Sequence, residues 1–114
     1  MNNVVNIKMK ERFGSFLSNG SLAAALSVNE LSPNIKAGNT VILDMSGVEN
    51  MTDSFGNALI ANMVKANGEV FFRCVKFSNC SETMKVLIKI AIKFGKMLES
   101  ENKQNQNIRS NGQN

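Results

Sequence analysis

The chain has 114 residues, a formal net charge of +4 and an apolar share of 43%, which fits one small globular domain with a single core. Histidine is absent, and this excludes Ser-His-Asp and Cys-His catalysis together with the commonest zinc ligand. The two cysteines, Cys74 and Cys80, have neither metal-ligand nor redox-motif spacing. Glycine-rich phosphate-binding patterns are missing as well. We therefore expect free thiols, no metal, no cofactor and no enzymatic activity.

The sequence also bears on location. The first ten residues, MNNVVNIKMK, contain no long apolar run followed by a small-residue cleavage site, so we expect no signal peptide. No stretch reaches the roughly 18 unbroken apolar residues that a membrane span needs. The prediction is a cytoplasmic protein without a membrane partner.

The sequence before residue 19 predicts two strands. Residues 4–9 begin with two valines and then alternate between apolar and polar side chains, which is typical of a strand with one wetter face. Residues 12–17, RFGSFL, form a second candidate strand. Lys10 and Glu11 are the predicted turn between them, and we expect an antiparallel hairpin.

A helix is predicted next. Asn19-Gly20-Ser21 is a capping signal. The run from Leu22 to Leu26 has high helix propensity and continues towards Leu31. Pro33, the only proline, is expected to end this helix, because its ring disfavours helical backbone at Ser32.

The central segment, 41–63, reads VILDMSGVENMTDSFGNALIANM and contains a buried-strand pattern, a polar loop and an apolar helix. The apolar run at its start ends in Asp44. Thr52-Asp53-Ser54 is typical of a helix start. The helix that follows has Lys65 as its only charge and is expected to close at Asn67-Gly68, because glycine readily adopts the left-handed conformation of a C-cap.

The last part of the chain predicts a strand over 69–77 and a helix from about Glu82 to Leu98, preceded by a cap at 78–81. One side of this helix carries a lysine row, which is either a contact surface for an acidic partner or a solvated face: Lys85, Lys89, Lys93 and Lys96. Residues 99–114 are rich in Asn and Gln and are predicted to be a disordered tail. The folded domain is then 1–98.

This order of elements predicts an α/β fold. We expect a single small domain with a mixed sheet of about four strands, parallel in its later part, and three helices packed on it. Ligands and partners of such sheets favour loops beyond the carboxyl ends of the strands, and the loop from Asp44 to Ser54 lies at such an end. The candidate partner-binding residues are Asp44, Ser46, Glu49, Asn50, Thr52, Asp53, Ser54 and Asn57.

Ser54 lies at or one residue inside the predicted helix N-terminus, where backbone N–H groups and the helix dipole favour negative charge. A phosphate on Ser54 would be tolerated there, and it would add nearly two negative charges to a loop that already holds Asp44 and Asp53. Such a change suits a binding surface that is switched off. The alternative is that Thr52, Asp53 and Ser54 only cap the helix and that Asp44 is a turn-former.

The segment LDMSGVENMTDSFGNALI resembles the signature of the STAS domain of sulfate transporters and anti-sigma factor antagonists. It resembles more closely the smaller STAS-like family of bacterial proteins. Leu43-Asp44-Met45 is similar to the strand end of the antagonist pattern, and Thr52-Asp53-Ser54 to its Asp-Ser-Ser step. The resemblance puts Ser54 at the serine that a partner anti-sigma kinase phosphorylates. Phe55 after this serine is typical of the STAS-like branch.

The resemblance implies a STAS-like fold and a non-enzymatic bacterial regulatory module. Its partner would be an anti-sigma-like or histidine-kinase-type ATP-binding protein, bound through the Asp44–Ser54 loop and the start of the following helix. A weak homodimer is a further expectation.

Two other functions remain open. A receiver-like phosphoacceptor at Asp44 needs further carboxylates for Mg²⁺ and a strand-end lysine. The early strands offer only Glu11 as a further carboxylate, and Lys76 alone is not enough. A basic nucleic-acid-binding module would use the lysine row, but the chain has no Tyr or Trp to stack on bases. We expect no specific nucleic-acid partner.

Overall fold

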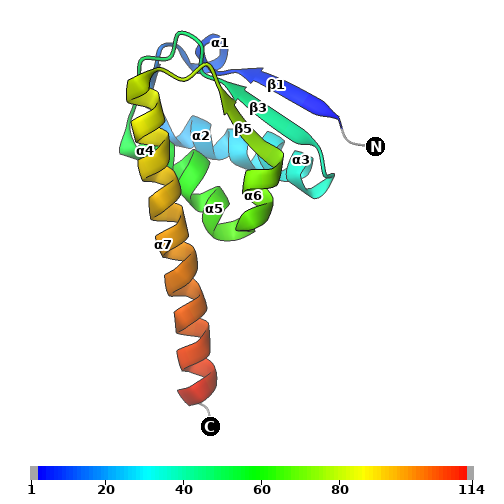
Figure 1. Ribbon diagram of the computed structural model, residues 1–114, viewed down its shortest axis with the longest axis vertical. Coiled ribbons are helices and arrows are strands. Elements are labelled where there is room, and N and C mark those ends of the chain that lie inside the picture. Colours follow the sequence, from blue (N-terminus) through cyan, green and yellow to red (C-terminus); the bar gives the residue numbers. More distant parts are fainter. Residues whose placement is uncertain (1–2, 113–114) are drawn as a thin grey trace.

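A computed structural model describes the backbone of residues 3–112 and the side chains of residues 3–101. It shows a small sheet lying across a layer of helices, with one long helix running away from both (Figure 1). The sheet has three parallel strands in the order β1-β3-β5. They are β1 (Val4–Lys8), β3 (Thr40–Asp44) and β5 (Val75–Ser78). The central strand β3 buries Val41 and Leu43 completely, so it anchors the core from which the Asp44 loop departs.

A second, two-stranded parallel sheet joins β2 (Phe16–Leu17) to β4 (Asn50–Met51). It fixes the far end of the Asp44 loop to the segment that precedes the first long helix. The backbone N–H of Thr52 donates to the carbonyl of Leu17 at 2.9 Å and extends this connection. The loop is therefore held at both ends by parallel pairing.

Within residues 3–112 the helices form five continuous segments. Two of them contain a π-helical turn. Their bounds are α1 (Met9–Phe13); α2 (Gly20–Leu26) with η1 (Ser27–Leu31) and α3 (Ser32–Lys36); α4 (Asp53–Gly56) with η2 (Asn57–Ala61) and α5 (Asn62–Asn67); α6 (Glu69–Cys74); and α7 (Glu82–Gly112). None of these helices combines the length and the apolar character needed to cross a membrane.

The α/β class and the position of the central strand are confirmed, but the predicted mixed sheet of about four strands with three helices is wrong. The predicted hairpin is absent from the described residues: Lys10 and Glu11 lie in α1, and β2 pairs with β4 instead of β1. The reason is the spacing of Met9 and Phe13. Residues four apart share one face of a helix, and α1 buries Met9 fully while it packs Phe13 against Phe55.

Pro33 does not end its helix. The helix passes through it to Lys36, with Pro33 in the first turn of α3 and the π-helical turn η1 directly before it. A proline cannot donate the usual i to i−4 hydrogen bond, and single π turns occur inside α-helices where the regular hydrogen-bond ladder is interrupted. The Ser27 hydroxyl in η1 donates to the carbonyl of Ala58 in η2 at 3.1 Å, which ties the two π turns together.

The predicted strand over 69–77 is also mostly wrong. Gly68 closes α5 as predicted, with a positive φ of +58° that favours glycine. The chain then forms α6, which buries Phe71 and Cys74 on one face, and only Val75–Ser78 is a strand. Three-residue spacing of buried side chains fits a helix, and this tertiary burial overrides the β propensity of the segment.

The start of α7 follows the prediction. The Ser81 hydroxyl accepts a hydrogen bond from the Met84 N–H at 3.1 Å and caps the helix, and Glu82 occupies its first turn. The helical backbone continues past the predicted end at Leu98 to Gly112. The side chains from residue 102 onward lie outside the described residues, so the predicted disorder of 99–114 stays a prediction.

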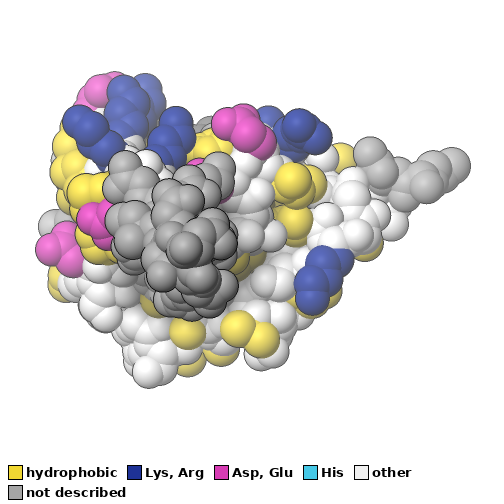
Figure 2. All heavy atoms as spheres, turned by 90° about the horizontal axis from the view of Figure 1, so that it is seen from below, with side chains coloured by type: hydrophobic (Ala, Val, Ile, Leu, Met, Phe, Trp, Pro, Cys, Tyr) yellow, Lys and Arg dark blue, Asp and Glu magenta, His cyan; other side chains and the backbone are white. Residues whose placement is uncertain are grey.

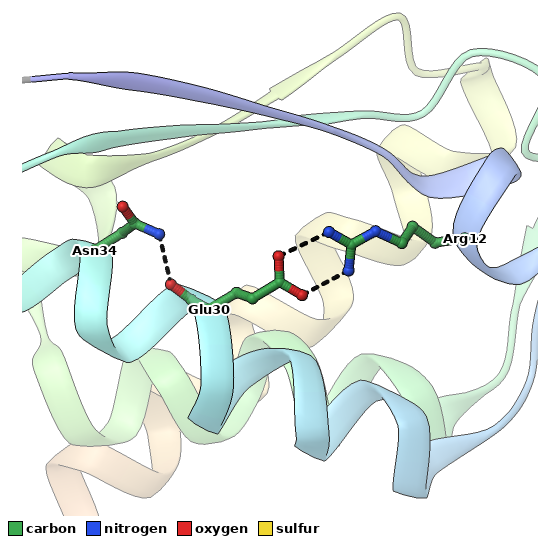
Figure 3. A network of polar contacts seen from close by, with 3 residues as sticks. All are labelled: Arg12, Glu30 and Asn34. Atoms are coloured by element: carbon green, nitrogen blue, oxygen red, sulfur yellow. Dashed lines mark hydrogen bonds and ion pairs between the residues drawn. The ribbon is translucent and has the colours of Figure 1, made fainter.

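An ion pair braces α1 against the helix of η1 and α3 (Figure 3). Arg12 binds Glu30 with both guanidinium nitrogens, at 2.5 Å from Nη1 to Oε2 and 2.7 Å from Nη2 to Oε1. The Asn34 amide donates to the backbone carbonyl of Glu30 at 2.7 Å. This contact keeps α1 in place beside η1, in the middle of the second helical segment.

The Glu30→Gln variant is expected to be less stable than the native chain at pH 7, and the difference should fade in acid. The hydrogen bond from Arg12 lowers the pKa of Glu30 below its ordinary value of 4.5. The stabilisation is therefore complete above the ordinary value and is lost as pH falls through the lowered pKa. Both side chains are partly exposed, 44% for Arg12 and 35% for Glu30, so solvent screening limits the contribution to about 0.2–1 kcal/mol.

Urea unfolding at pH 7 and pH 3 measures this difference. Glu11→Gln is the control, because among the described side chains Glu11 makes only a long, exposed contact with Lys8 at 3.8 Å. A Glu30→Gln difference that grew as pH fell would contradict the assignment.

Candidate functional site

Asp44 ends β3 as a half-buried carboxylate held by two donors. Its Oδ1 accepts from the Asn79 amide at 3.0 Å and from the Ser46 N–H at 2.9 Å. The Asn79 hydrogen bond, then the Ser46 N–H, and then the charge of Lys8 lower the pKa of Asp44, so it is ionised at neutral pH. These are the contacts of a turn-forming carboxylate, and they tie the loop after β3 to the loop after β5.

The loop beyond Asp44 alternates between anchors and exposed polar groups. Met45 and Val48 are buried, while Ser46, Glu49 and Asn50 are exposed. The Glu49 N–H donates to the carbonyl of Ser15 at 2.7 Å. The backbone is therefore fixed, and the three predicted partner-binding side chains point to solvent as a set.

Thr52, rather than Ser54, caps the helix of α4. The Thr52 hydroxyl oxygen accepts from the N–H of Phe55 at 3.2 Å, which is the usual capping bond between an N-cap and N3. Asp53 and Ser54 occupy the first two helical positions and are exposed. The capping interpretation thus accounts for Thr52 alone, and the Ser54 hydroxyl is at the surface.

Ser54 faces the start of α2. It lines an open hollow with Asn19, Gly20, Ser21 and Ala58, and a Cβ added at Gly20 would collide with the Ser54 hydroxyl oxygen. Phe55 points the other way: it is fully buried, with its ring 5.4 Å from that of Phe13 in an edge-to-face arrangement. Consecutive residues therefore supply the accessible hydroxyl and the anchor that holds it in place.

Asp53 and Asn57 lie on a different side of α4 from Ser54. They line a small hollow between α4 and α7, together with Leu87 and Ile90 of α7. Residues 53 and 57 are one helical turn apart and share a face. The start of α4 thus presents its hydroxyl towards α2 and its carboxylate towards α7.

The predicted site therefore divides into two groups. Thr52, Asp53, Ser54 and Asn57 are collected on one helix start, whereas Asp44 is bound to Ser46 and Asn79. Among the described residues, no hydrogen bond or ion pair joins Asp44 to the helix start. Within the same residues, no cluster of three His, Cys, Asp or Glu side chains could hold a metal ion.

Sequence analysis missed two residues of this region. Asn79 follows β5, the neighbour of β3, and the carboxyl ends of parallel strands meet at one edge. That placement was a usable signal, but the predicted strand over 69–77 obscured it. Gly20 gave no signal beyond helix capping, because its contact with Ser54 depends on how α2 packs against α4.

One comparison with known proteins found a match. The model of the family described as "STAS-like domain of unknown function (DUF4325)" matches residues 28–85. The matched stretch contains β3, the Asp44 loop, the start of α4 and β5. No curated protein and no solved structure matches the chain.

Proposed function

Because the chain belongs to the STAS-like domain family, as its central signature predicted, we propose that it is a non-enzymatic bacterial regulatory module. It binds a protein partner through the Asp44–Ser54 loop and the start of α4. The partner is an anti-sigma-like or histidine-kinase-type ATP-binding protein. One observation at the start of α4 supports this proposal: Thr52 caps the helix, and Ser54 is exposed.

Phosphorylation of Ser54 is the proposed switch. The Ser54 oxygen attacks the γ-phosphorus of the partner's ATP, the bond to the β-phosphate oxygen breaks, ADP leaves, and the serine proton passes to a base of the partner. The product carries nearly two negative charges next to Asp53. Its position in the first turn of α4 tolerates this charge, because the helix dipole favours anions there.

The surroundings of Ser54 explain how the charge would change the surface. The hydroxyl already lies against Gly20, where even a methyl group would not fit. A phosphate is larger than a hydroxyl, so it must turn outward or displace the segment of Asn19 to Ser21. Either response changes both the shape and the potential of the surface that the partner binds.

The Ser54→Asp variant is expected to bind the partner about tenfold or more weakly than the native chain, because it places a fixed negative charge in the interface. The probe is a purified ATP-binding protein of the anti-sigma, histidine-kinase-type class, and binding is measured by titration calorimetry. Ser54→Ala should bind like the native chain. Ser100→Asp is the charge control, since Ser100 is exposed on α7, and it should also bind normally.

Incubation with the same partner and Mg²⁺-ATP should add the mass of one phosphate to the native chain but not to Ser54→Ala. Equal affinities of the native chain and Ser54→Asp would reject the switch. Failure of the native chain to bind would reject the proposed function itself.

A further inference from the structure

The long helix α7 carries an apolar stripe on its exposed side. Its members are Val86, Ile90, Phe94 and Met97, which are 56%, 55%, 36% and 49% exposed. The opposite face of the helix is buried against the domain through residues that include Met84, Ile88 and Ala91. Two apolar faces on one helix indicate that the domain covers one of them and that another molecule covers the second.

The spacing of the exposed stripe indicates what covers it. Together with the half-buried Leu87, the stripe members Ile90, Phe94 and Met97 are spaced at intervals of three, four and three residues, which is the repeat of a helix that packs along another helix. Leu87 and Ile90 also line the hollow between α7 and α4. A helix laid on this seam would therefore lie beside α7 and cover that hollow.

The charged residues beside the stripe indicate which charge the partner helix carries. Each stripe member follows a lysine directly, so the row of Lys85, Lys89, Lys93 and Lys96 borders the whole stripe. Figure 2 shows basic side chains gathered at one corner of the molecule with hydrophobic side chains beside them. Lys85 pairs with Glu82 at 3.3 Å, and the Lys96 ammonium lies 5.1 Å from the centroid of the Phe72 ring.

The two middle lysines of the row, Lys89 and Lys93, indicate the charge of the partner. Among the described residues, neither Lys89 nor Lys93 takes part in an ion pair. They are therefore available to a partner, and charge complementarity requires acidic groups opposite them.

Two other occupants fit less well. A second copy of this chain packed antiparallel along α7 would bring the two lysine rows together, which is repulsive. An anionic membrane surface would attract the lysines, but Asp53 lies on the other border of the stripe, at the hollow that Ile90 lines, and would oppose the headgroups.

We infer that the exposed stripe of α7 is a docking surface for an amphipathic α-helix of a partner protein. That helix has an apolar seam and an acidic flank, which faces Lys89 and Lys93. The docking surface borders the side of α4 that carries Asp53 and Asn57, whereas Ser54 lies on the side that faces α2.

A synthetic heptad peptide tests this inference with the full-length chain. The probe has Leu and Ile along its seam, Glu along one flank and Gln along the other, and the matched peptide has Lys in place of Glu. The Glu peptide should bind about tenfold or more tightly than the Lys peptide at physiological salt, measured by fluorescence anisotropy. The double variant Lys89→Glu with Lys93→Glu should reverse this preference.

The apolar seam is tested by Ile90→Ser combined with Phe94→Ser, which should weaken the Glu peptide about tenfold. Val28→Ser is the control, because Val28 is 68% exposed but lies on η1, and it should bind normally. Ser54→Asp should bind this peptide like the native chain, which separates the result from the proposed switch.

Three results would overturn the inference: no binding of the Glu peptide, equal binding of both peptides, or a normal affinity in the Ile90 and Phe94 variant. Sedimentation of the chain as a dimer that Ile90→Ser dissociates would assign the stripe to a second copy. Binding to phosphatidylglycerol vesicles that the same change abolishes would assign it to a membrane.

Discussion

Replacing Phe55 by alanine is expected to lower the free energy of unfolding by about 3–5 kcal/mol. Phe55 is fully buried beneath the exposed start of α4, and its ring packs edge-on against Phe13 of α1 at 5.4 Å. The substitution removes the transfer free energy of the ring and leaves a cavity that the surrounding elements fill only partly. It also loses the aromatic pair, which contributes about 0.5–1.5 kcal/mol beyond its buried area.

Urea unfolding of the purified variants measures this loss. Phe55→Leu should cost less than about 1.5 kcal/mol, because it keeps most of the apolar volume. Phe16→Ala is the control for removing a phenylalanine from the surface, since Phe16 is 52% exposed, and it should cost well under half as much as Phe55→Ala. A loss below about 1.5 kcal/mol for Phe55→Ala would show that Phe55 does not anchor α4.

Phe55 also explains why the site region could be predicted while much of the fold could not. Three features depend on residues that are close together in the sequence. They are the strand end at Asp44, the helix cap at Thr52 and the helix end at Gly68. Local chemistry decides them, so the sequence is sufficient. The burial of Phe55 against Phe13 joins residues far apart in the chain, and it turns the segment 9–13 into a helix rather than a hairpin turn.

The candidate site, too, could be predicted only in part. Which residues carry hydroxyls and carboxylates could be predicted, because the loop and the helix start are local features. The separation of Asp44 from the residues at the start of α4 could not be predicted, because it depends on contacts with distant segments of the chain. Asp44 is held by Asn79, and Ser54 lies against Gly20, in each case across about 35 residues of chain.

Replacing Gly95 by valine is expected to lower the free energy of unfolding by about 3 kcal/mol, at the upper part of the usual range for overpacking. Gly95 is buried where α7 crosses the helix of η2 and α5. A Cβ at this position would lie 2.8 Å from the carbonyl oxygen of Ala61 and 2.8 Å from the Cβ of Val64. The first of these neighbours is backbone, so it cannot rotate away, and the two helices must separate.

The intrinsic preference of a helix opposes this effect only weakly. Valine is better than glycine in a helix by less than about 1 kcal/mol, which is smaller than the cost of separating two packed helices. Gly95→Ala gains more propensity and adds less volume, so its net loss should be about 1–2 kcal/mol. Ser100→Ala is the control on the same helix, since Ser100 is exposed, and it should change stability by less than about 0.5 kcal/mol.

Chemical unfolding ranks these three variants by their free energy of unfolding. Binding of the Glu peptide to the stripe reports whether α7 keeps its position against α4. Leu87 and Ile90 approach α4 on the same helix that Gly95 holds against η2. Separation of α7 should therefore widen the hollow and weaken the Glu peptide in Gly95→Val, whereas Ser100→Ala should bind normally. A Gly95→Val chain as stable as the native one would mean that α7 does not pack this closely, and the stripe would then lose the fixed position on which its docking depends.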